Sequence, residues 1–181
     1  MRKLVDLLYI GQVARLISLF MQYDRAHPSP ANAFQLAHAR LLLDSHRALL
    51  KRDLLESSSM EIGRALYEAP MVVLAHDTAA DPVFFYGNLA AQHLFELSWN
   101  ELVQLPSRFS AEPVARDERQ RLLDLVSSQG FIDNYSGVRI AKSGRRFLIK
   151  QATVWNLIGN DGQVLGQAAA FDYWAPVASP E

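Results

Sequence analysis

Three strand-length segments near the C-terminal end constrain the fold of this chain most. They cover residues 131–140, 146–158 and 163–174 and are rich in aromatic and β-branched side chains, which favour strands. The stretches between them, Lys142–Arg145 and Gly159–Gly162, have hairpin-turn composition. Because so short a connection joins antiparallel neighbours, these segments predict a three-stranded antiparallel meander.

Two further strands and a set of helices come before this meander. The runs 71–75 and 83–86 are apolar and are separated by turn residues, which predicts a hairpin. Asn88 is a suitable helix N-cap, and Ser98 with Glu101 forms a capping box for another short helix. This order of elements predicts an α+β fold with helices on one face of a five-stranded antiparallel sheet.

The N-terminal part of the chain predicts helices. Amphipathic periodicity covers residues 4–23 and 31–55, and Ser58 with Glu61 three residues later predicts a third helix start. The second helix carries an apolar seam that could contact either the core or a partner helix. This seam consists of Phe34, Ala37, Leu41, Ala48 and Leu55.

Composition excludes several classes of protein. The chain has 181 residues, no cysteine and a formal net charge of -1. The lack of cysteine excludes disulfides, thiolate metal sites and flavin photochemistry that forms a cysteinyl adduct. The balanced charge argues against direct nucleic-acid binding and against an anionic membrane surface. Polar residues interrupt the N-terminal apolar run, so we expect no signal peptide, no membrane span and a cytoplasmic location.

A local basic cluster surrounds one predicted hairpin. It consists of Arg139, Lys142, Arg145 and Arg146. The sequence shows no aromatic platform or recognition helix beside it, so we interpret this cluster as a solvated turn.

Short strings along the chain resemble one protein family. They are Leu74–Asp77, Asp81–Phe84, Leu105–Arg108, Ser110–Pro113, Ser143–Phe147 and Ala152–Trp155. They resemble the MEKHLA family of PAS-related domains, over about residues 38–174. The resemblance implies a PAS-like domain over residues 70–181, preceded by an N-terminal helical extension over 1–69. PAS domains are sensory or interaction modules that hold many ligands or none, so the ligand stays open.

A PAS-like fold implies a pocket between the inner face of the sheet and the helices. Such pockets are mostly apolar with a few convergent polar groups. The candidate lining residues are Tyr86, Asn88, Arg108, Tyr135, Gln151, Thr153 and Trp155. Arg108 has two interpretations: it clamps a ligand carboxylate, or it braces its own loop through Glu112 or Asp117. We favour the brace, because nearby acids can satisfy the guanidinium without a ligand.

Catalytic and metal signals are weak. The pair His76-Asp77 could supply a general base or could stabilise a strand end, and no GxSxG or HExxH motif accompanies it. His93 is a single histidine on a predicted helix, which argues against haem ligation. We therefore assign no catalytic or metal residue, and the cofactor stays unknown.

These observations predict a non-catalytic sensory or interaction module. We expect it to bind a small ligand or a protein partner and to signal through dimerisation. The alternative is a small-molecule enzyme that uses the same pocket.

We predict a homo-oligomer built through the N-terminal helices, because residues 4–23 and the seam offer more apolar surface than one small sheet can cover. Light scattering at micromolar concentration measures this directly. A protein that is monomeric at this concentration, and whose oligomeric state does not change on deleting residues 1–30, would contradict the prediction.

Overall fold

The sheet of this protein has one strand more than the sequence predicts. The computed structural model describes residues 24–55, 61–111 and 116–177. Five antiparallel strands follow the order β2-β1-β5-β4-β3, and β6 pairs with β4 beyond the end of β5. The strands are β1 (Val72–His76), β2 (Phe84–Gly87), β3 (Phe131–Ile140), β4 (Arg146–Ile158), β5 (Val164–Phe171) and β6 (Tyr173–Pro176). The predicted antiparallel α+β architecture is therefore confirmed, with the third meander segment divided into β5 and β6.

The helices fall into two groups along the chain. The first group precedes β1: η1 (Pro30–Asn32), α2 (Leu36–Leu50) and α3 (Ile62–Tyr67). The second lies between β2 and β3: α4 (Leu89–Phe95), α5 (Trp99–Leu102), η2 (Ser107–Ser110) and α6 (Arg116–Gln129). The predicted cap at Asn88 is confirmed, since its side-chain oxygen accepts from the Ala91 N–H, and the Ser98–Glu101 capping box is confirmed as well. The predicted helix 4–23 and the cap at Ser58 lie outside the described residues.

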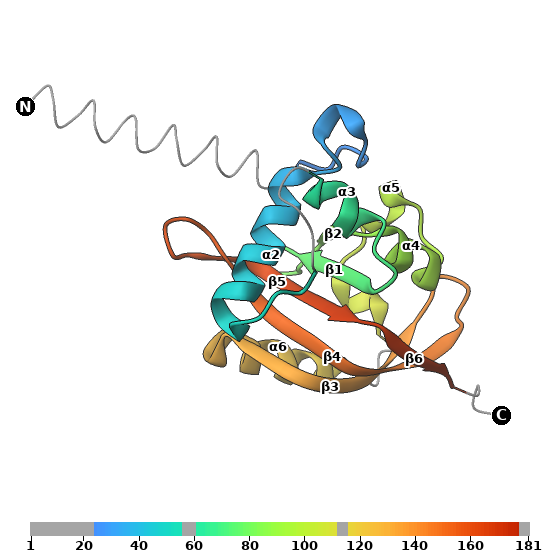
Figure 1. Cartoon of the computed structure of the whole chain (residues 1–181). Coiled ribbons are helices and arrows are strands. Elements are labelled where there is room, and N and C mark those ends of the chain that lie inside the picture. Colours follow the sequence, from blue (N-terminus) through green and yellow to red (C-terminus); the bar gives the residue numbers. More distant parts are fainter. Residues whose placement is uncertain (1–23, 56–60, 112–115, 178–181) are drawn as a thin grey trace, which may run out of the picture.

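Each face of the sheet carries its own helical layer. Figure 1 shows α2 across one face of the sheet, with α6 beneath the other. Trp155 pairs across the strands with Ala168, and Ala168 pairs with Ala75, so these three residues share the α2 face. Val154 and Ala169 point the opposite way and pack against α6. The small alanine side chains on the α2 face leave room for a helix to approach closely.

Trp155 fixes α2 on the sheet. Its side chain is fully buried, and its indole Nε1 donates to the main-chain oxygen of Leu42 at 3.2 Å. The His46 ring meets the Trp155 ring edge-on at 5.0 Å between centroids. The Ser45 hydroxyl accepts a 2.8 Å hydrogen bond from the Ile158 N–H. An indole, an imidazole and a hydroxyl thus attach one helix to one strand.

The buried face of α2 coincides only in part with the apolar seam seen in the sequence. Ala37 and Ala48 are exposed, and Leu41 is only partly buried. The residues that face the core are His38, Ala39, Leu42, Leu43, Ser45 and His46. Phe34, Leu41 and Leu55 of the seam pack against this core as partly buried side chains. The seam therefore gives only part of the core-packing face, because apolar periodicity cannot identify polar side chains that are buried with partners.

The buried position of His46 favours its neutral imidazole. Burial lowers the pKa of His46 below its ordinary value of 6.5. Its Nδ1 donates to the main-chain oxygen of Arg52 at 3.0 Å, and the Arg52 side chain pairs with Asp133 at 2.7 Å. Thr153 donates to the same Asp133 carboxylate, which together with Arg52 lowers the pKa of Asp133. The loop after α2 is thereby tied to both β3 and β4.

Side chains from α2 and α3 share one hydrophobic core with the sheet. Leu42, Leu66 and Tyr67 belong to the same buried cluster as Phe85 and Trp155. The division of the chain at residues 69 and 70 stays a prediction.

We expect Trp155→Ala to lower the free energy of unfolding by about 3–5 kcal/mol, because it removes a buried aromatic side chain and leaves a cavity under α2. Urea unfolding followed by circular dichroism measures the change. Trp174→Ala is the matched control, since Trp174 is 38% exposed on β6 and its loss should cost much less. Equal destabilisation by the two substitutions would contradict the described orientation of β4.

Candidate functional site

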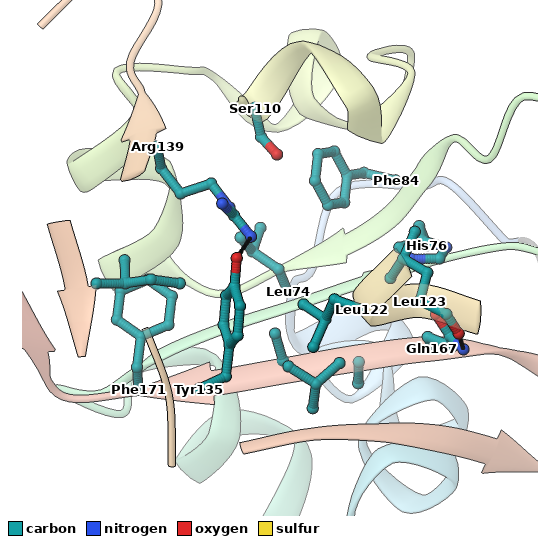
Figure 2. Close-up of a pocket in the computed structure, with 14 residues that line it drawn as sticks. Leu74, His76, Phe84, Ser110, Leu122, Leu123, Tyr135, Arg139, Gln167 and Phe171 are labelled. Carbon is teal, nitrogen blue, oxygen red and sulfur yellow. Dashed lines mark hydrogen bonds between the residues drawn. The ribbon is translucent and has the colours of Figure 1, made fainter. Parts of the chain in front are cut away.

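A cavity of about 60 Å³ lies between the sheet and the layer formed by η2 and α6. By the same measure one water molecule needs about 10–15 Å³, so the space suits a small molecule of a few heavy atoms. Apolar side chains form most of its wall, and a few buried polar groups interrupt them (Figure 2). The lining residues are Leu74, His76, Phe84, Ser110, Leu122, Leu123, Tyr135, Arg139, Ile149, Val154, Gln167, Ala168, Ala169 and Phe171.

Tyr135 and Arg139, both on β3, form one polar side of this cavity. Arg139 is 8% exposed; its Nη1 donates to the Val138 main-chain oxygen at 2.8 Å and its Nη2 to the Tyr135 hydroxyl at 3.3 Å. The guanidinium carbon also lies 5.4 Å from the centroid of the Tyr135 ring. Figure 2 shows the two side chains meeting at this hydrogen bond.

The interpretation of the basic cluster as a solvated turn is wrong for Arg139. Lys142 and Arg145 do lie on the surface, where they pair with Glu101 and Glu96. Hydrogen bonds from Lys142 and from Ser98 lower the pKa of Glu101 to about 2. Arg139 instead faces the cavity, because alternate residues of a strand point to the same side. It lies two positions beyond Gly137 and four beyond Tyr135 on β3.

Local backbone geometry places the Tyr135 ring in the cavity. The pairing of β3 with β4 is irregular between Ile132 and Gly137, and Asn134 has a φ of 62°. A Cβ at Gly137 would lie 2.2 Å from the Tyr135 hydroxyl oxygen. Only glycine therefore leaves room for the ring to lie along its own strand and meet Arg139.

His76 lines the cavity from β1. Its Nδ1 lies 2.9 Å from the main-chain oxygen of Asp77, and because a carbonyl only accepts, this nitrogen carries the proton. The Asp77 carboxylate accepts from the N–H groups of Ala79 and Val83 instead. Of the two interpretations of His76-Asp77, the geometry matches the strand-end turn, since the carboxylate is directed to the turn and not to the imidazole.

Gln167 joins the sheet to α6 beside the cavity. Its Nε2 lies within hydrogen-bond distance of the Leu123 main-chain oxygen, the Ser127 hydroxyl and the Asn156 side-chain oxygen, at 3.0, 3.0 and 3.1 Å. Asn156 in turn donates to the main-chain oxygen of Val126. The sequence analysis missed Gln167, although its parity on β5 matches that of Ala169 and Phe171, which also line the cavity.

Of the pocket candidates named from the sequence, Tyr135 lines this cavity and the others lie elsewhere. Trp155 and Thr153 point to the α2 face. Tyr86 also lies away from the cavity, next to His38 and Trp99, and its burial raises the pKa of its hydroxyl. Phe85 is the extra residue of a bulge between β1 and β2.

Asn88, Arg108 and Gln151 have structural surroundings of their own. Besides capping α4, Asn88 donates to the Met71 main-chain oxygen at 2.7 Å. The Arg108 Nε donates to Asp81 at 2.9 Å, and its guanidinium lies 4.0 Å from the Phe109 ring centroid. Gln151 is exposed and has a φ of 54°.

Arg108 is engaged by a partner that the sequence analysis did not name. Glu112 and the side chain of Asp117 lie outside the described residues, and the contact with Asp81 joins the η2 segment to the turn between β1 and β2. The geometry is that of a brace.

Metal-ligating clusters and membrane-spanning helices are both absent from the described residues. No group of three or more His, Asp or Glu side chains among them is placed to hold a metal ion. Within the same ranges, no helix has the length and apolarity to cross a membrane.

Comparison with known proteins identifies the family. A family model described as the MEKHLA domain matches residues 36–176. This chain belongs to the MEKHLA domain family. The match includes α2, so the helix that covers Trp155 is part of the family domain. No protein with a curated description matches the chain.

Solved structures show that the MEKHLA domain of this chain has the PAS fold. A PAS domain from Colwellia psychrerythraea is 14% identical with a TM-score of 0.52, over 63% of this chain and 92% of that one. An RNA-binding light-oxygen-voltage receptor is 17% identical with a TM-score of 0.51, over 63% of this chain and 32% of that one. At these identities the likeness concerns the fold alone.

We expect Gly137→Ala to displace the Tyr135 ring and break its hydrogen bond to Arg139, because the added methyl group would collide with the phenol oxygen. The tyrosine ultraviolet spectrum and the side-chain NMR signals of Arg139 measure the displacement. Gly144→Ala is the control for backbone strain alone, since Gly144 has a φ of 88° and open space around it. Unchanged Tyr135 and Arg139 signals in Gly137→Ala would contradict this geometry.

Proposed function

We propose that this MEKHLA domain is a non-catalytic sensory or interaction module that binds a small molecule between the sheet and α6. The observation that carries this proposal is the cavity itself, in which Tyr135, Arg139 and Gln167 interrupt an apolar wall. Small-molecule sites have this character, because apolar surface supplies affinity and a few polar groups fix orientation. The PAS fold supports the proposal, since a PAS-like domain is expected to hold a pocket between the inner face of its sheet and the helices.

A series of contacts leads from the cavity to the N-terminal segment. His76 lines the cavity, and the adjacent Asp77 carboxylate lies 3.6 Å from the guanidinium of Arg25. Arg25 also donates to the Val103 main-chain oxygen and accepts from the indole of Trp99, both at 2.8 Å. A ligand that shifts His76 would therefore change how the segment before α2 packs.

The output that we propose is a change in association with a second copy or with another protein. Ala37 and Ala48 on α2 are exposed and Leu41 is partly exposed, so part of the apolar seam is accessible to a partner helix. A ligand that favours one packing of the N-terminal helices would alter this association by its differential affinity for the two states.

A second candidate function is small-molecule catalysis in the same cavity. One observation favours it: His76 and Tyr135, both able to transfer protons, line a common space. Against it, the Asp77 carboxylate does not orient the imidazole. Recovery of a bound compound chemically unchanged after long incubation would support the sensor, and its conversion would support the enzyme.

We expect freshly purified protein to bind at least one compound of a metabolite library, detected by native mass spectrometry and by a raised melting temperature. Ala169→Leu should abolish this binding, since Ala169 lines the cavity and the larger side chain would occupy it. Val164→Leu on the same strand is the control, because Val164 is exposed and outside the cavity. Binding that is unaffected by Ala169→Leu, or no binding by the wild type, would contradict the proposed function.

A further inference from the structure

Arg139 is a buried cation without a counter-charge in the described part of the chain. Its two hydrogen bonds go to the neutral oxygens of Val138 and Tyr135. A guanidinium has five N–H donors and keeps its charge in a protein. A buried charge is destabilising unless an opposite charge and hydrogen bonds compensate it.

The other arginines show that carboxylates are available to this chain. Six described arginines, all with more exposed side chains, pair with an Asp or Glu side chain. They are Arg25, Arg47, Arg52, Arg64, Arg108 and Arg145. The arginine that most needs a counter-charge is thus directed into a cavity, where a ligand can supply one.

A second polar group in the cavity wall also lacks a partner. The Oε1 atom of Gln167 accepts no hydrogen bond from the described residues, and the side chain is 4% exposed as a whole. The contacts of Nε2 fix the orientation of this amide, so the oxygen is the atom that needs a donor. Figure 2 shows Gln167 and His76 on one side of the cavity and Arg139 and Tyr135 on the other.

We propose that the ligand is a small monocarboxylic acid whose far end carries a hydrogen-bond donor such as a hydroxyl group. Its carboxylate pairs with the Arg139 guanidinium and accepts from the Tyr135 hydroxyl. Its short apolar body lies against Leu74 and Leu122, and its donor reaches the Gln167 oxygen. The volume of about 60 Å³ limits it to a short chain. This inference rests on the proposed function and names the ligand class for the same cavity.

The experiment compares charged and neutral probes of equal shape. The full chain is titrated with short-chain acids from propionate to hexanoate, with their terminal hydroxy forms, and with the matching primary amides, by calorimetry and thermal shift. We expect the acids to bind and to raise the melting temperature, the hydroxy acids to bind more tightly, and the amides to bind at least about 10-fold more weakly.

Variants then assign the charge to one residue. Arg139→Met should weaken acid binding by roughly 10- to 100-fold, because it removes charge-assisted hydrogen bonds while keeping much of the stem volume. Arg108→Met is the matched control: that arginine is paired with Asp81 outside the cavity, and its loss should leave acid binding unchanged. Tyr135→Phe provides a milder arm, with an expected loss of about 2- to 10-fold.

The stability of the ligand-free protein provides an independent readout. Removing an uncompensated buried charge should leave the melting temperature of Arg139→Met equal to or above that of the wild type. A clear fall, or failure of this variant to fold, would show that contacts within the chain already compensate the Arg139 charge, and it would overturn the inference.

Failure of the inference is distinguishable from failure of the proposed function. A library compound that binds in the cavity, is lost in Ala169→Leu and binds Arg139→Met as well as the wild type would overturn the acid ligand and leave the sensor intact. Absence of any cavity ligand would overturn both.

Discussion

Strand β4 has to pack against a helical layer on each of its faces, and the rest of the structure depends on how it does so. Trp155 and Leu157 need a cover on one side, and α2 provides it through the contact of the indole with Leu42 and His46. Val154 and Asn156 need a cover on the other side, where α6 lies. The cavity lies on this second side of the sheet, opposite Trp155.

The elements that depend on local chemistry could be predicted from the sequence. Strands 131–140 and 146–158 have the predicted bounds, since alternating bulky residues and glycine turns act over a few positions. What could not be predicted is which helical layer covers each of the two sets of alternating β4 side chains. A period of two shows that Thr153 and Trp155 share a face, but the identity of the covering helix depends on contacts more than a hundred residues apart, such as Trp155 with Leu42.

Buried polar residues account for most of what the sequence analysis missed in the site. A composition-based pattern assigns arginine, glutamine and histidine to the surface, whereas Arg139, Gln167 and His76 line the cavity. The alternation of side chains along a strand was the sequence signal that could have found such residues. Arg139, for example, lies two positions after Gly137 and four after Tyr135, so it shares a face with Tyr135. Arg108 is a pocket candidate from the sequence, but in the structure it pairs with Asp81 outside the cavity. Asp81 lies in a distant turn that no local sequence pattern connects to Arg108.

The central claim is that the cavity beneath β4 and β5 holds a ligand whose anionic end meets Arg139. A crystal structure of protein purified without added ligands tests this most directly. The account predicts electron density in the cavity that is not explained by the chain, with a flat, branched end against the Arg139 guanidinium and the Tyr135 hydroxyl. A cavity filled by the side chains of this chain, or an Asp or Glu carboxylate of the chain itself bound to Arg139, would contradict it.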